Sequence, residues 1–119
     1  MTTPSLAPVL NRIDGDLDAA LDRLFSLLRV PSISTDPSYA ADCQKAAKMK
    51  CEDLISLGAD ARIDETPGHP MVVGHLKGDG PHVIFYGHYD VQPVDPIELW
   101  ARDPFDPADD DGPSGPCIR

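Results

Sequence analysis

The sequence predicts an α/β fold in which a mixed β-sheet is flanked by helices. Two segments in the first half of the chain have the apolar spacing of amphipathic helices, and short segments with strand patterning follow them. The last of these, "HVIFYG" at 82–87, is almost continuously apolar, as are strands covered on both faces of an α/β sheet. At 119 residues the chain has the size of a single domain.

We expect the first helix at 16–29, after a lead-in at 1–13 without regular structure. Asp14 and Asp16 suit the positive N-terminal end of a helix, and Pro31 ends it because proline cannot continue the hydrogen-bond ladder. The apolar residues recur with the helical period on one face: Leu17, Ala20, Leu21, Leu24, Leu27 and Leu28.

The second helix is predicted at 37–57. Asp36 is a favourable N-cap residue, and Pro37 suits the first turn. Gly58 is a typical residue after the C-terminus of a helix. Small residues on one face, among them Cys43, Ala46 and Ala47, favour close packing against a sheet.

Three strands are predicted after this helix, near 60–65, 71–76 and 82–88. The glycines and proline at 77–81 indicate a tight turn, so we expect 71–76 and 82–87 to pair in antiparallel fashion. Strands covered on both faces are typical of parallel sheets, so a sheet that also contains this antiparallel pair would be a mixed sheet. The proline, aspartate and glycine content from 91 to 115 predicts a long loop.

The charge of the chain excludes some classes of partner. With 20 acidic and 10 basic side chains, the formal net charge is −10. Nucleic acids and anionic membranes are bound through basic patches, so neither is an expected partner. No apolar run approaches the ~20 residues that span a bilayer, and no signal peptide is recognisable, so we expect a cytoplasmic protein. The acidic residues after Asp90 have two interpretations, a solvated loop or a cation-binding neighbourhood.

The three cysteines are expected to be reduced and structural. Cys43, Cys51 and Cys117 form an odd number and no Cys-x-x-Cys pair. On a helix, the first two would lie two turns apart, roughly 12 Å by helix rise, which is too far for a disulfide.

His88 and Asp90 follow directly on the most apolar predicted strand. Ligands of open α/β sheets gather beyond the carboxyl ends of strands, and residues i and i+2 of an extended segment point to the same side. A metal-bound histidine commonly donates its other ring N–H to a carboxylate, so the pair can supply a ligand and its orienting group. A surface ion pair is the alternative interpretation. The other histidines are interpreted as structural: His69, His75 and His82.

The segment "GHYDVQPVDPIELW" at 87–100, followed by "DPFDP" at 103–107, resembles the zinc-dependent aminoacylase and dipeptidase family. This family includes acetylornithine deacetylase, succinyl-diaminopimelate desuccinylase and carnosinase-type dipeptidases, and "HYDVQP" is most similar to the dipeptidase branch. The resemblance extends over most of the chain, including "VPSIST" at 30–35. It implies that residues 1–119 are the N-terminal portion of a zinc-peptidase catalytic domain, an incomplete one.

The resemblance also implies a chemistry. His88 would ligate one of two zinc ions, and Asp90 would be the catalytic aspartate that orients the His88 imidazole; manganese or cobalt would suit the same ligand types. Members of the family hydrolyse the amide bond of dipeptides or N-acyl amino acids by two-metal catalysis, with a glutamate as general base. Full-length members are often homodimers.

The chain departs from the family pattern because several family residues have no matching position in it. These are the bridging aspartate, the general-base glutamate, a further acidic ligand and a late histidine. One histidine with one orienting aspartate cannot hold a catalytic zinc, which takes at least three protein ligands. We therefore expect the isolated chain to be an inactive fragment of an amide hydrolase. The alternatives are a small acidic binding protein that kept the beginning of the fold without the chemistry, and a fragment that completes its site with another chain.

Overall fold

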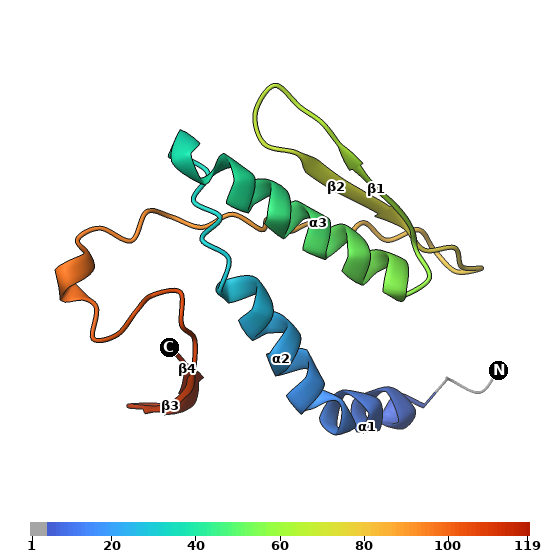
Figure 1. Ribbon diagram of the computed structural model, residues 1–119. Helices are drawn as coiled ribbons and strands as arrows, with labels where there is room; N and C mark the ends of the chain where they lie inside the picture. Colours follow the sequence, from blue (N-terminus) through green and yellow to red (C-terminus); the bar gives the residue numbers. More distant parts are fainter. Residues whose placement is uncertain (1–4) are drawn as a thin grey trace.

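The structure, a computed structural model, describes residues 5–119 and confirms the α/β class. Helices occupy the first half of the chain and short antiparallel sheets follow (Figure 1). The helices and strands, in order, are α1 (Ala7–Gly15), α2 (Leu17–Leu28), α3 (Ala40–Ser56), β1 (Asp60–Asp64), β2 (Met71–His75), β3 (Asp109–Gly112) and β4 (Gly115–Ile118). Two 3₁₀ turns, Pro37–Tyr39 and Ile97–Leu99, complete the secondary structure.

The helix predicted at 16–29 is confirmed as α2. The lead-in without regular structure, predicted at 1–13, is wrong from Ala7 onward, because α1 forms there. Residues 1–4 of the predicted lead-in lie outside the described residues. A proline in the first turn of α1 suits a helix start. From the N-cap residue onward, large apolar residues follow the helical spacing i, i+3, i+4 and i+7, yet all four are exposed: Leu6, Val9, Leu10 and Ile13. The local pattern is therefore sufficient for a helix here, and α1 buries none of its residues.

The second predicted helix is confirmed as a 3₁₀ turn that continues into α3. The Asp36 carboxylate accepts hydrogen bonds from the backbone N–H and the hydroxyl of Ser38, at 2.9 and 2.8 Å. These bonds, the backbone one foremost, lower the pKa of Asp36 because they stabilise its charged form. Gly58 follows the helix with φ +87°, a conformation that glycine adopts without strain.

The buried face of α3 packs against β1 and β2, as its small residues predicted (Figure 1). Its buried residues are Cys43, Ala46, Ala47 and Cys51. Gly74 of β2 permits the close approach, since a Cβ atom at this position would lie 2.9 Å from Leu54 Cδ1. The cysteines are free, as expected.

The predicted strands near 60–65 and 71–76 are confirmed as β1 and β2, but their pairing is not the expected one. β2 pairs with β1 in antiparallel register, from Asp60 opposite His75 to Asp64 opposite Met71. The predicted pairing of 71–76 with 82–87 is wrong, and the described residues form two separate two-stranded sheets instead of one mixed sheet. Among residues 5–119, β1 is therefore the one strand that pairs with β2.

The third predicted strand, near 82–88, is wrong. This segment lies outside any strand and returns past α3 as an irregular trace (Figure 1). Its apolar side chains face solvent, with exposed fractions of 79% for Val83, 86% for Ile84, 99% for Phe85 and 88% for Tyr86. The apolar run predicted a strand covered on both faces. Such a strand needs other helices or strands packed against it, and residues 5–119 place none against this segment.

The predicted loop from 91 to 115 is wrong at its end, where β3 and β4 form a hairpin. The strands pair from Asp109 opposite Ile118 to Gly112 opposite Gly115. Two residues, Pro113 and Ser114, connect the last pair, and such short connections are typical of antiparallel hairpins. The remainder of this segment is irregular except for the second 3₁₀ turn.

The core is small and lies where α3 meets the segment after α2. The buried apolar residues are Val30, Ile33, Cys43, Ala46, Ala47 and Cys51. The Cα radius of gyration is 17.5 Å, larger than the roughly 13–14 Å of a compact domain of this length. The described chain is therefore open in shape. None of its helices is long and apolar enough to cross a membrane.

Ala46→Leu is expected to destabilise this core. Ala46 is a fully buried residue of α3, and added methyl groups in a packed core cost about 1–3 kcal/mol. The exposed Ala41 of the same helix is the matched control, and Ala41→Leu is expected to leave the unfolding midpoint nearly unchanged. Urea unfolding followed by circular dichroism measures both variants; equal midpoints would contradict the burial of Ala46 in the core.

Candidate functional site

His88 and Asp90 form a hydrogen-bonded pair directly after the exposed apolar segment. His88 Nδ1 lies 2.9 Å from Asp90 Oδ1 and 3.1 Å from the Asp90 backbone oxygen. Since both partners can only accept, Nδ1 carries the proton and Nε2 holds the lone pair of the neutral ring. The His88 side chain is 74% exposed, so Nε2 is accessible. Asp90 therefore lies on the same side as His88, as the i, i+2 relation predicts, in a position to orient the ring.

A third side chain, Ser34, holds the other oxygen of the same carboxylate. Its hydroxyl donates to Asp90 Oδ2 at 2.5 Å. This bond is the main reason that the pKa of Asp90 is lowered; partial burial opposes it, and the contact with His88 adds to it. Burial and the nearby Asp90 carboxylate raise the pKa of the Cys43 thiol, since both disfavour the thiolate.

The backbone around Asp90 is fixed along the segment that links α2 to α3. Val91 N–H donates to Ser32 O at 3.0 Å, and the Ser32 hydroxyl donates to Tyr89 O at 2.9 Å. Ile33 and Val91 form an isolated parallel bridge. Ser32 is 1% exposed, so the hydrogen bond from its hydroxyl to Tyr89 O satisfies a buried polar group.

The connection between β1 and β2 joins this arrangement. The Tyr89 hydroxyl donates to Pro70 O at 2.5 Å, and His69 Nε2 lies 2.7 Å from Ser34 O. His69 thus contacts the backbone, in agreement with its structural interpretation. The rings of His75 and His82 meet edge to face, with centroids 5.8 Å apart.

Sequence reasoning missed the serines of this site. Ser32 and Ser34 lie 57 and 56 positions from their partners Tyr89 and Asp90. No spacing rule connects residues so far apart. The only signal was that "VPSIST" was part of the family resemblance, which assigned no role to its serines.

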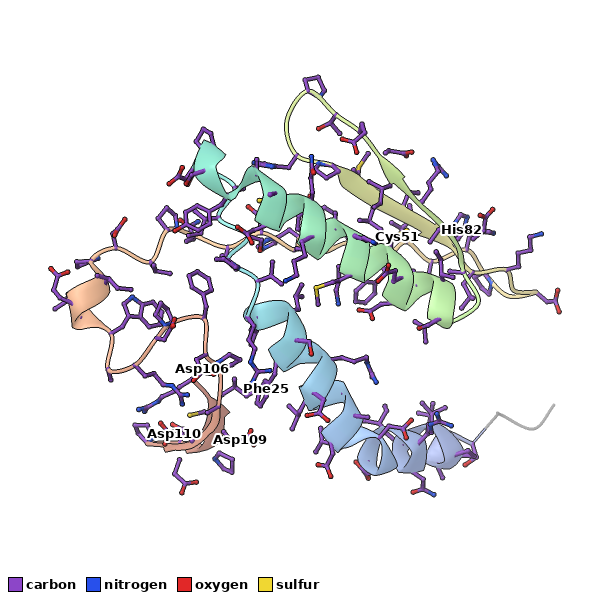
Figure 2. The ribbon with its side chains drawn as sticks, in the orientation of Figure 1. Phe25, Cys51, His82, Asp106, Asp109 and Asp110 are labelled. Atoms are coloured by element: carbon purple, nitrogen blue, oxygen red, sulfur yellow. The ribbon has the colours of Figure 1, made fainter. Side chains whose placement is uncertain are left out.

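The acidic residues after Asp90 do not gather with His88. Figure 2 shows Asp106, Asp109 and Asp110 at the C-terminal hairpin region, where Asp106 pairs with Arg102 at 3.2 Å and Asp110 with Arg119 at 3.3 Å. Among residues 5–119 no three His, Cys, Asp or Glu side chains are placed to hold one metal ion. The described residues therefore fit one ligand position with its orienting carboxylate and do not form a complete metal centre.

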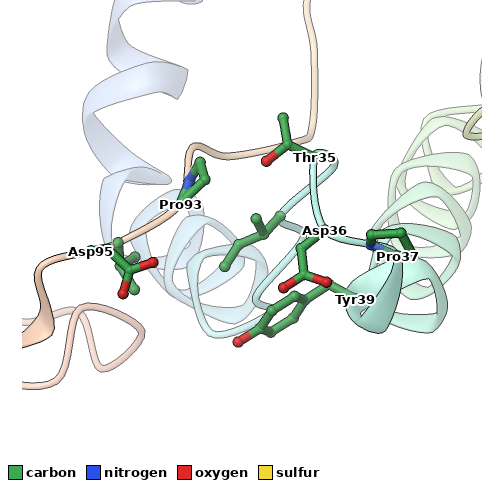
Figure 3. A pocket seen from close by; sticks show the side chains of 8 residues that line it. Thr35, Asp36, Pro37, Tyr39, Pro93 and Asp95 are labelled. Atoms are coloured by element: carbon green, nitrogen blue, oxygen red, sulfur yellow. The ribbon is translucent and has the colours of Figure 1, made fainter.

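The structure also has a hollow of about 390 Å³, whose lining does not include His88, Asp90 or Ser34 (Figure 3). It is formed by the start of the second helical segment and the chain just after Asp90. Its lining residues are Ile33, Thr35, Asp36, Pro37, Tyr39, Pro93, Val94 and Asp95. Its two carboxylates give it a negative character.

Comparison with known proteins gives relatives along most of the chain. The succinyl-diaminopimelate desuccinylase of Pseudomonas fluorescens is 35% identical over 91 residues, which are 76% of this chain and 22% of that protein. The Cys-Gly metallodipeptidase DUG1 of Saccharomyces cerevisiae is 28% identical over 85% of this chain and 24% of its own length. No family model matches the sequence.

A solved structure agrees with the sequence matches. The dipeptidase Dug1p from Saccharomyces cerevisiae superposes with a TM-score of 0.78 at 28% identity, over 89% of this chain and 25% of that one. The chain thus spans about a quarter of the length of the relatives it matches.

The chain shares the α/β fold of a portion of a dipeptidase. Its relatives are hydrolases that include metallodipeptidases and desuccinylases. The chain belongs to the aminoacylase and dipeptidase family. The resemblance drawn from the sequence is confirmed.

Proposed function

We propose that this chain contributes the first part of the active site of a metal-dependent amide hydrolase, which cleaves dipeptides or N-acyl amino acids as a longer protein. The observation that carries the proposal is the His88–Asp90 pair, in which Nδ1 is held at 2.9 Å and Nε2 is exposed. It lies in the segment that resembles the family, and the relatives act as metallodipeptidases and desuccinylases.

In this proposal His88 is a metal ligand through Nε2, and Asp90 is the catalytic aspartate that fixes the ring. A held Nδ1–H selects the tautomer whose Nε2 can bind a metal, and it raises the basicity of that nitrogen. Two zinc ions are the proposed cofactors, with manganese or cobalt as alternatives; when bound, such ions polarise the amide carbonyl and lower the pKa of water. The remaining ligands belong to the longer protein.

The proposal also covers the organisation of the protein. Residues 1–119 form the N-terminal portion of the catalytic domain, and a further domain mediates homodimer formation in a cytoplasmic enzyme. The isolated chain is inactive because its described residues offer one ligand where a catalytic zinc takes at least three.

The test begins with the DNA beyond codon 119. An in-frame continuation, expressed as the longer protein, is expected to hydrolyse members of a panel of dipeptides and N-acyl amino acids. Activity should disappear with a chelator and return with zinc, whereas the isolated chain should show no turnover. Chelator-sensitive turnover by the isolated chain, or turnover by the longer protein that is indifferent to chelators, would contradict the proposal.

A further inference from the structure

The Asp90 carboxylate has a partner on each oxygen, and the two partners differ in kind. Oδ1 faces His88 Nδ1 at 2.9 Å, and Oδ2 accepts from the Ser34 hydroxyl at 2.5 Å. The terminal torsion of an aspartate is broad, so a carboxylate held at one oxygen can still rotate. Held at both oxygens, it keeps one orientation toward the imidazole.

Ser34 is itself held in place by the backbone. Its carbonyl oxygen lies 2.7 Å from His69 Nε2 and accepts a hydrogen bond from it. On the preceding side, Ser32 bonds to both Val91 N–H and Tyr89 O, and Ile33 is buried. The segment 32–34 therefore runs fixed beside 89–91, and the Ser34 hydroxyl is directed at the carboxylate by elements distant in sequence.

The two serines of this segment have separable tasks. Ser32 is buried and bonds only to main-chain atoms, which stabilises the packing of the two segments. Ser34 is half-buried and bonds to the side chain that contacts the imidazole. A role in orienting His88 is therefore specific to Ser34.

We propose that Ser34 is a positioning residue for His88, acting through the Asp90 carboxylate so that the ring keeps its proton on Nδ1 and offers Nε2 outward. The consequence for metal binding rests on the proposed function, but the effect on the ring does not. Without the hydroxyl, Oδ2 turns to water, the carboxylate rotates, and the imidazole populates both neutral tautomers.

Ring-¹⁵N NMR of the histidines in the metal-free chain measures the tautomer of His88 directly. The pH is about 8.5, above the ordinary histidine pKa of about 6.5. All samples carry Phe85→Lys, a substitution at a 99% exposed apolar side chain that is expected to reduce self-association of the chain. The parent is expected to show His88 as the Nδ1–H tautomer. Ser34→Ala is expected to give mixed-tautomer nitrogen shifts, and Ser34→Thr, which retains a hydroxyl, should restore the parent spectrum.

Two controls separate positioning from general destabilisation. Ser38→Ala removes another serine–aspartate contact, with Asp36, and is expected to leave the His88 nitrogens unchanged. Ser32→Ala is expected to lower the unfolding midpoint while His88 keeps its tautomer in the folded population. Parent-like His88 shifts in a folded Ser34→Ala chain would overturn the proposal, as would an equal change in Ser38→Ala.

The longer protein provides the second measurement. There Ser34→Ala is expected to weaken zinc binding about ten-fold in chelator competition, the lower end of the effect of groups that orient metal ligands. If the longer protein does not hydrolyse amides, the proposed function fails while the tautomer result still decides the role of Ser34. If hydrolysis is found and the tautomer does not change, only the role of Ser34 fails.

Discussion

His88→Ala in the longer protein is expected to lower kcat/KM for its substrate by about 10³-fold or more. Metal ions contribute several kcal/mol of transition-state stabilisation in such sites, and each 1.36 kcal/mol corresponds to ten-fold in rate. Under the proposed function, removal of Nε2 would take away a metal ligand, and among the described residues no three His, Cys, Asp or Glu side chains are placed to hold the ion without it. The measurement is steady-state kinetics together with metal content by mass spectrometry.

His82→Ala is the matched control for this prediction. His82 is also exposed and lies six positions earlier, with its ring against His75 instead of a carboxylate. It is expected to retain near-parent activity and full metal content. Asp90→Ala should fall between the two, with a loss of about 10- to 100-fold, because it removes the orienting group and leaves the ligand. Full activity of His88→Ala would contradict its assignment as a metal ligand.

The second large effect concerns Phe85, for which opposite results are expected in the short and the long protein. In the isolated chain, Val83, Ile84, Phe85 and Tyr86 present an uncovered apolar segment, and unpaired strand-like segments associate with one another. Burial of one phenylalanine contributes about 1.5–3 kcal/mol, so Phe85→Lys is expected to weaken self-association by about 10- to 100-fold. Sedimentation velocity over a concentration series measures this.

Leu57→Lys provides the charge-matched control. Leu57 is 72% exposed after α3, so the substitution adds the same charge without touching the segment 82–87. It is expected to leave self-association unchanged. An equal effect of both substitutions would mean that net charge, which is −10 in the parent chain, controls association instead of the apolar segment.

In the longer protein the same Phe85→Lys substitution is expected to prevent folding or to destabilise it severely. The relatives are about four times as long as the matched region, which leaves ample chain to cover the segment 82–87. A lysine buried there would lose its hydration without a partner. Limited proteolysis and thermal unfolding of the longer variant are the measurements, and parent-like stability would show that the segment stays exposed there as well.

Local features were predicted from the sequence because their causes are local. The helical period identified α2 and the face of α3 that is buried, and Asp36 and Gly58 marked the limits of the second helical segment. The i, i+2 relation was enough to place the Asp90 carboxylate beside His88. The apolar spacing of α1 was equally present in the sequence, and its assignment as a lead-in was an error of interpretation, not a missing signal.

Only the tertiary structure decided which segments became neighbours. An apolar strand pattern shows that a segment requires cover but not which segment provides it, so β2 paired with β1 while 82–87 stayed exposed. The contact between Ser34 and Asp90 joins residues 56 positions apart. It depends on how the link after α2 folds back along 89–91. The sequence by itself determined the histidine–aspartate pair; the packing of distant segments decided what holds the aspartate, because hydrogen-bond partners far apart in the chain are selected by the fold as a whole.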